Sequence, residues 1–217
     1  MLPVADVLKR TDDLLLDADR VRWTTAERIR WMNEAMGAIL TRKPTAFSVT
    51  KTISLIAGTR QTIDGDMLLD VVRNVGPEPD NKPGKAIRRT DRQLLDDSDP
   101  DWHKAKPRAE IRHYTFDDRA SDEFYCYPPA LAGTRVEIMQ AELPAQVAET
   151  NDAASLDIGF EYLEAVVNYV VYRCNSKDSE YAAPATAAAF YQAFEAALGI
   201  KSQSENAASP NQPTNSV

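Results

Sequence analysis

The sequence predicts an α+β fold: an antiparallel-like four-helix bundle of two N-terminal and two C-terminal helices, with an inserted β-rich domain and an extended C-terminal tail. Three observations lead to this prediction. Apolar residues recur at helical spacing near both ends of the chain, and from about residue 47 to 143 they alternate as in strands. The stretch 201–217 contains no aromatic residue. We therefore assign 1–45 and 150–200 to the bundle, 46–149 to the inserted domain and 201–217 to a partner-docking tail.

The two N-terminal helices are predicted from an apolar stripe and a capping motif. Between Pro3 and Leu16 the apolar residues fall at helical offsets, which indicates the first helix. Thr24, followed three residues later by Glu27, forms a capping box at the start of the second helix. Pro44 is expected to end the second helix, because a proline cannot continue the backbone hydrogen-bond ladder.

The middle of the chain is predicted to be mostly β. Turn residues such as Asp64-Gly65-Asp66 and Gly133 separate short segments of alternating or β-branched residues. Thr90 or Asp91 is positioned to cap a brief helix within this region. The predicted strands are residues 47–50, 52–56, 67–75, 85–89, 110–116, 123–127 and 135–141.

Helical spacing returns in the C-terminal part. A stripe from Leu156 to Cys174 that includes Phe160 predicts a third helix, with Asn151, Asp152 and Ser155 as candidate caps. Asp178 or Ser179 opens a fourth helix, with Pro184 in its first turn and Gly199 as its C-cap. None of the four stripes can be buried alone, and pairing them in a bundle would bury all of them.

The segment Lys201–Val217 is too polar to order itself. Fixing a backbone costs about 1–2 kcal/mol per residue, so ordering this segment costs roughly 17–34 kcal/mol. After Ile200 the only sizeable apolar side chain is Val217. We therefore expect the tail to take a fixed shape only against another molecule, which makes the chain part of an assembly. The candidate docking residues are Gln203, Asn206, Pro210, Asn211, Pro213 and Val217.

The charge pattern bears on the possible partners. A net charge of −8 argues against a grip on nucleic acid, although it suits a channel through which DNA slides without adhering. No apolar run reaches the length of a membrane span, and no secretory signal is visible. One basic cluster stands out, and we favour an inter-subunit or partner contact for it over DNA. It consists of Lys82, Lys85, Arg88, Arg89 and Arg92.

No catalytic, cofactor or metal motif was found. Phosphate-binding glycine loops and nucleophile elbows are absent. His103 and His113 would have to converge with both cysteines to bind zinc, and the acidic run 96–101 lacks the glycine and glutamate of a calcium-binding loop. Cys126 and Cys174 are interpreted as reduced thiols, because two cysteines make no disulfide framework. The sequence thus predicts a non-enzymatic protein without cofactor or metal.

Several motifs, in this order, resemble the head-to-tail adaptor (connector) proteins of tailed bacteriophages, most closely those of short-tailed phages. The likeness covers roughly residues 1–200. It is carried by 23–35 (WTTAERIRWMNEA), 57–61 (AGTRQ), 69–74 (LDVVRN), Asp91-Arg92, 99–103 (DPDWH), 113–116 (HYTF) and 124–129 (FYCYPP).

This resemblance implies a structural protein of the virion, made in the host cytoplasm and located at the head–tail junction. Adaptors of this class form a ring, commonly of twelve copies, beneath the portal. The ring extends the channel for double-stranded DNA, which passes without sequence-specific binding, and contacts tail or nozzle proteins. Their C-terminal segment typically docks onto the portal. The family has no catalytic residues to carry over.

Two other functions remain open from the sequence. One is a tail-completion or tail-terminator protein that contacts the tail tube instead of the portal. The other, from a different class, is a monomeric hydrolase or nucleic-acid enzyme with an unrecognised site. Mass in the presence of the portal distinguishes a ring from a monomer.

Overall fold

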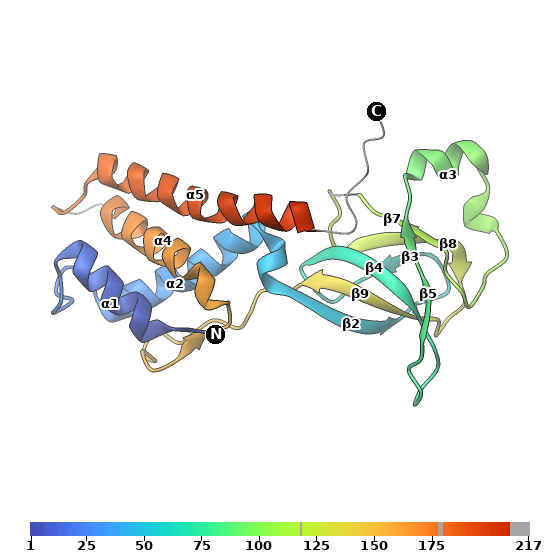
Figure 1. Ribbon diagram of the computed structural model, residues 1–217, viewed down its shortest axis with the longest axis horizontal. Helices are drawn as coiled ribbons and strands as arrows, with labels where there is room; N and C mark the ends of the chain where they lie inside the picture. Colours follow the sequence, from blue (N-terminus) through green and yellow to red (C-terminus); the bar gives the residue numbers. More distant parts are fainter. Residues whose placement is uncertain (118, 178–179, 209–217) are drawn as a thin grey trace. The chain divides into compact units, whose positions relative to one another are not determined.

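The computed structural model describes residues 1–117, 119–177 and 180–208, with side chains up to Gly199. The chain divides into two compact units (Figure 1). A helical unit is formed by Met1–Ala46 and the chain from Pro144 onward, and a β-rich unit by Phe47–Leu143.

The predicted fold class, a four-helix bundle with an inserted β-rich domain and an extended tail, is wrong. The described residues form a β-rich α+β fold of five α-helices and ten strands in three sheets. Strands form at Leu2–Pro3 and Ser155–Leu156, so Pro3 and Leu156, which helical spacing placed at the starts of the first and third helices, belong to strands. The two strands pair with each other, and each completes the backbone hydrogen bonds of the other. Because the paired residues lie far apart in sequence, the local spacing of apolar residues does not predict this pairing.

In the helical unit, α4 (Leu163–Ser176) packs against α1 (Val4–Leu15), α2 (Thr25–Arg42) and α5 (Pro184–Ala208). The buried faces of α1, α2 and α4 are mostly aliphatic, and Phe194 of α5 is fully buried beside Tyr169 of α4. The two-stranded sheet of β1 (Leu2–Pro3) and β10 (Ser155–Leu156) belongs to this unit. The helical unit therefore contains a small sheet as well as helices.

The β-rich unit contains two four-stranded sheets. One has the order β2-β9-β4-β5 and the other β3-β8-β7-β6, and all pairs are antiparallel except β6–β7. The first sheet consists of β2 (Ser48–Ser54), β9 (Arg135–Ala141), β4 (Met67–Val75) and β5 (Pro83–Ala86). The second consists of β3 (Gly58–Thr62), β8 (Glu123–Ala130), β7 (His113–Thr115) and β6 (Arg88–Arg89).

The core of the β-rich unit draws on both sheets. Val71, Ile138 and Phe124 are among its buried apolar residues. The buried side chain of Asn74 forms two hydrogen bonds with the backbone of Ile111. Its Nδ2 donates to the Ile111 carbonyl, and its Oδ1 accepts from the Ile111 amide, both at 2.8 Å. The short helix α3 (Arg92–Ser98) begins after Asp91, whose side chain accepts from the Gln93 amide, as predicted.

The ends of the two C-terminal helices differ from the sequence prediction. The predicted stripe from Leu156 starts too early: α4 begins at Leu163, after a single 3-10 turn at Phe160–Tyr162, and Phe160 is exposed. α5 begins at Pro184, later than predicted, and the predicted opening residues Asp178 and Ser179 lie outside the described residues. The lack of an amide donor on proline favours this first position. Gly199 does not end α5, which continues to Ala208. A glycine permits a helix end without imposing one, and the next proline is Pro210.

Candidate functional site

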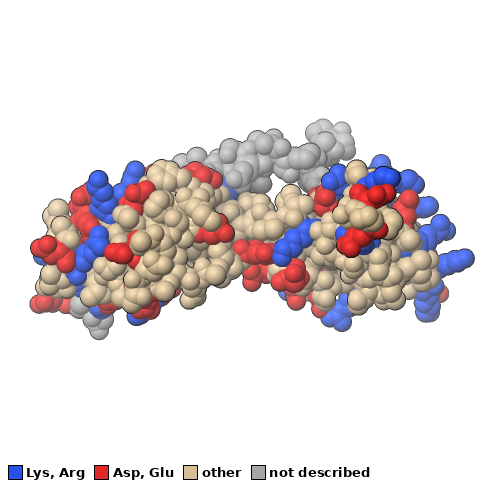
Figure 2. Space-filling view, turned by 90° about the horizontal axis from the view of Figure 1, so that it is seen from below, with Lys and Arg blue, Asp and Glu red and all other residues tan. Residues whose placement is uncertain are grey.

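The predicted basic cluster lies in the β-rich unit, and all five side chains are exposed. Lys85 is on β5, Arg88 and Arg89 form β6, Arg92 opens α3, and Lys82 lies in the turn before β5. Figure 2 shows that Lys and Arg side chains gather on part of the surface of this unit.

Most of this cluster has a local partner. Lys82 pairs with Asp80 at 3.0 Å, Lys85 with Glu110 at 2.9 Å and Arg92 with Asp96 at 3.4 Å. The Arg89 guanidinium lies 4.3 Å from the centre of the Phe116 ring. These contacts lower the charge available to a polyanion and leave a mixed polar surface.

Beside this cluster, a group of rings is organised around Trp102, which is fully buried. The His103 ring stacks on it at 3.7 Å between centroids, and Tyr125 and Tyr127 meet it edge-on. The indole Nε1 donates to Asp96 Oδ1 at 2.8 Å. The ring group fixes the segment after α3, so its role is to support this surface.

Three turns of the β-rich unit meet at a second exposed surface. Leu131 N donates to Arg108 O at 3.1 Å, and Gly133 N donates to Leu55 O at 2.9 Å. Ile56 and Leu131 are 64% and 46% exposed. We call the exposed residues Ile56, Lys106, Arg108 and Leu131 the turn patch. Sequence reasoning missed it, because its members come from three separate segments.

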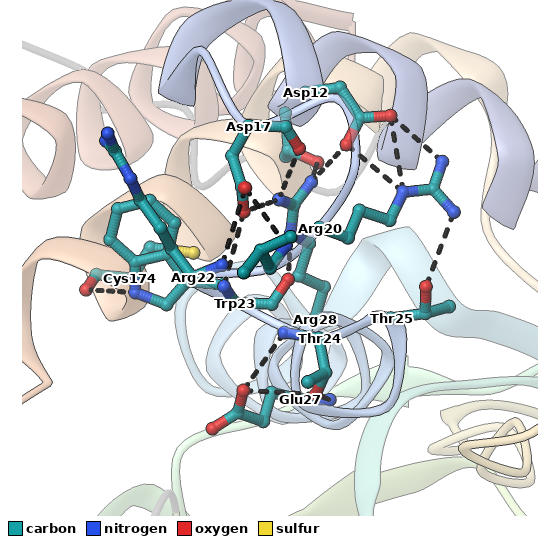
Figure 3. Close-up of polar contacts among 12 residues, drawn as sticks. Asp12, Asp17, Arg20, Arg22, Trp23, Thr24, Thr25, Glu27, Arg28 and Cys174 are labelled. Atoms are coloured by element: carbon teal, nitrogen blue, oxygen red, sulfur yellow. Dashed lines mark hydrogen bonds and ion pairs between the residues drawn. The ribbon is translucent and has the colours of Figure 1, made fainter.

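The helical unit contains a buried arginine that sequence reasoning also missed. Arg28 of α2 is 0% exposed and uses every donor of its guanidinium (Figure 3). Its Nη1 donates to Asp12 Oδ1 and to Thr11 Oγ1. Its Nη2 donates to the side chain and to the carbonyl of Asp17, at 2.9 and 3.2 Å. Its Nε donates to the carbonyl of Trp23 at 3.1 Å. The available signal was that position 28 lies four residues before Met32, on the buried face of the helix.

The Asp17 carboxylate organises the loop between α1 and α2. It accepts from the backbone amides of Val21, Arg22 and Trp23 at 3.1–3.4 Å, as drawn in Figure 3. Burial alone would raise the pKa of Asp17. These three amides, joined by the charge of Arg28, hold the pKa below the ordinary value of an aspartate. The Asp17 carboxylate is therefore ionised, with one set of bonds to the loop amides and another to the Arg28 guanidinium.

Two further contacts brace the same loop. Arg20 forms a forked pair with Asp12, with Nε and Nη2 at 3.1 and 2.9 Å from the carboxylate oxygens. The Trp23 indole donates to the Cys174 carbonyl of α4 at 2.9 Å. The loop is thus tied to three helices of its unit.

This braced loop exposes apolar side chains. Leu14, Leu16 and Val21 are 50%, 86% and 80% exposed. Asp13 and Asp19 are exposed beside them, and neither forms an ion pair with a residue of the described ranges. We call Asp13, Leu14, Leu16, Asp19 and Val21 the corner patch.

Leu16 occupies an unfavourable backbone conformation for its residue type. It caps α1 in the left-handed region with φ 51° and ψ 44°, where asparagine and glycine are preferred. We expect Leu16→Asn to stabilise the isolated chain by about 0.5–1 kcal/mol, since it relieves this strain and loses few contacts. Urea unfolding measures the change. Leu14→Asn, on the regular helix, is the control and should be neutral or slightly destabilising; equal effects of both changes would contradict the argument.

Within the described residues, no group of three or more His, Cys, Asp and Glu is positioned to hold a metal ion. Cys126 and Cys174 are free and buried, and burial raises their pKa values to about 11 and about 12. Such thiols are neutral at physiological pH and poor nucleophiles.

The predicted docking residues of the tail are only partly described. Gln203 and Asn206 lie on α5, where only the backbone is described, and the helix contradicts the predicted extended form of this part. Pro210, Asn211, Pro213 and Val217 lie outside the described residues. Their role as docking residues stays a prediction.

Exposed apolar and charged patches on braced loops are typical of proteins that bind other proteins. A family model described as SU10 adaptor protein matches residues 2–214. The chain therefore belongs to the SU10 adaptor protein family, and the predicted resemblance to phage head-to-tail adaptors is confirmed. No curated protein matches the chain.

Membership of this family implies a virion protein that is not an enzyme and that interacts with portal and tail proteins. Separately, none of the described helices has the length and apolarity of a membrane span.

Proposed function

We propose that the protein forms a ring, of twelve copies, beneath the portal of a bacteriophage capsid, and that the ring extends the DNA channel and connects capsid to tail. The family match over residues 2–214 carries this proposal, because it covers both units and most of the C-terminal segment. The net charge of −8 suits a channel that DNA passes without adhering.

The mass of the complex with the portal tests ring formation. Twelve copies of a 24.1 kDa chain add about 0.29 MDa to a portal ring, which light scattering resolves. The measurement includes the portal, because an adaptor can stay monomeric until it binds. Binding of a single copy, or binding to a purified tail tube without any binding to the portal, would contradict the proposal.

We further propose that the segment from Gln203 to Val217 docks onto the portal. Its polar composition gives it no core of its own, and Pro210 and Pro213 limit the entropy lost on ordering. Prolines cannot donate to a strand ladder, so a groove and strand addition both remain as binding modes.

Deleting residues 203–217 is expected to abolish portal binding, with at least a hundredfold loss of affinity, while leaving the fold intact. Removing only 209–217, which keeps all of α5, is the matched comparison and separates docking by the helix end from docking by the residues after it. Calorimetry with purified portal measures both, and circular dichroism checks the fold. Full affinity after the longer deletion would disprove the docking role.

The basic cluster is proposed as an inter-subunit or partner contact. Lys82, Lys85 and Arg92 already face carboxylates, so the surface offers directional pairs to a protein more than bare charge to DNA.

A further inference from the structure

The corner patch is an apolar surface on a rigid support. Asp17 and the buried Arg28 fix the loop that carries Leu16 and Val21, so these side chains are held outward in one arrangement. Docking on such a surface costs little ordering entropy. Leu16 is also 86% exposed, and a partner that covers it would remove this apolar area from water.

The turn patch has the same apolar character and the opposite charge. Ile56 and Leu131 are flanked by the cationic side chains of Lys106 and Arg108. Neither cation forms an ion pair with a residue of the described ranges. Asp13 and Asp19 flank the apolar residues of the corner patch in the same way, and the exposed guanidinium of Arg22, next to Val21, lies over the Tyr181 ring at 4.8 Å from its centroid. The two patches are therefore complementary in charge, and each offers apolar area to the other.

We propose that the corner patch of one copy docks on the turn patch of the next copy. Every chain carries both patches, and they are unlike, so the contact is heterologous and repeats from copy to copy, as a ring requires. A two-fold dimer would instead pair one patch with itself, where like charges meet. This inference rests on the proposed ring and names the surfaces that close it.

Charge reversal on exposed residues tests the contact without disturbing the core. The corner variant carries Asp13→Lys and Asp19→Lys, and the turn variant carries Lys106→Glu and Arg108→Glu. Each alone should weaken self-association at least about tenfold, because attraction becomes repulsion. Lys9→Glu with Arg10→Glu, on the exposed side of α1, matches the charge change of the turn variant but lies one helical turn from Asp13 and keeps the corner patch acidic, so it should not weaken self-association.

Mixing the two variants gives the decisive measurement. The basic corner of the first meets the acidic turn patch of the second, and the acidic corner of the second meets the basic turn patch of the first. An equimolar mixture should therefore recover wild-type mass, as should one chain carrying all four changes. Light scattering at low salt, alone and on the portal, follows the mass. A contact within one chain would be restored in the fourfold variant but not in the mixture, and this result would overturn the inference.

Leu16→Asn provides an independent variant that should fold at least as well as the wild type. It removes the most exposed apolar side chain of the corner patch and should weaken association several-fold while unfolding at equal or higher urea concentration. Unchanged association of this variant and of both charge variants, in a protein that still forms rings on the portal, would overturn the inference and leave the proposed function standing. A wild type that stays monomeric with and without the portal would overturn both.

Discussion

Replacing Arg28 with methionine is expected to destabilise the helical unit by about 3–5 kcal/mol, because a buried ion pair is broken from one side. Methionine has a similar volume, so packing changes little. The carboxylate of Asp17, 6% exposed, would lose its counter-charge, and that of Asp12, 14% exposed, would keep only Arg20. The carbonyls of Asp17 and Trp23 would also lose their donors.

Urea unfolding monitored at the aromatic residues of the helical unit measures this loss. Arg20→Met is the matched control, since Arg20 shares Asp12 with Arg28 but is 27% exposed, and it should cost much less. An Arg28→Met variant within 1 kcal/mol of the wild type would show that the network does not brace the loop.

The same network makes the helical unit sensitive to acid. The folded-state pKa of Asp17 is lowered, so its contribution is present above the pKa of an unfolded aspartate, near 4, and is lost as the pH falls through the folded value. The stability difference between wild type and Asp17→Asn should therefore shrink below about pH 4.

Trp102→Ala is the second change with a large expected effect, about 3–5 kcal/mol in the β-rich unit. The indole is fully buried, so its removal leaves a cavity beneath His103 and between Tyr125 and Tyr127. The carboxylate of Asp96 also loses the indole donor and keeps only Arg92. Trp102→Phe keeps most of the volume and should cost less than half as much.

Hydrogen exchange resolved to β7 and β8 reports this loss, because the ring group packs on those strands. Leu94→Ala, on the exposed side of α3, is the control and should change exchange little. Loss of protection confined to α1 and α2 in the Trp102 variant would contradict the assignment of Trp102 to the core of the β-rich unit.

Local signals predicted several elements well. Thr24 and Glu27 form the capping box, and β4 and β9 span residues 67–75 and 135–141 as expected. These elements are determined by neighbours in sequence. The β1–β10 pairing is determined by residues far apart in sequence, which is why Leu156 was placed in a helix. The spacing of apolar residues also did not show that Phe160 lies in a 3-10 turn before α4.

The candidate surfaces divide in the same way. The basic cluster is visible in the sequence because its members lie within eleven positions, but its ion pairs with Glu110 and Asp80 are not. The corner patch depends on a left-handed residue at position 16, and the turn patch on three turns brought together by strand pairing. Such surfaces arise only from the folded backbone.

The central place of α4 constrains when the molecule can mature. The first two helices emerge from the ribosome early, yet the helix on which they pack is synthesised about 120 residues later. Until α4 is synthesised, the apolar faces of these two helices stay exposed to solvent or are bound by chaperones. A chain terminated prematurely, before residue 163, would never complete this unit, so only finished translation products reach an assembly-competent form.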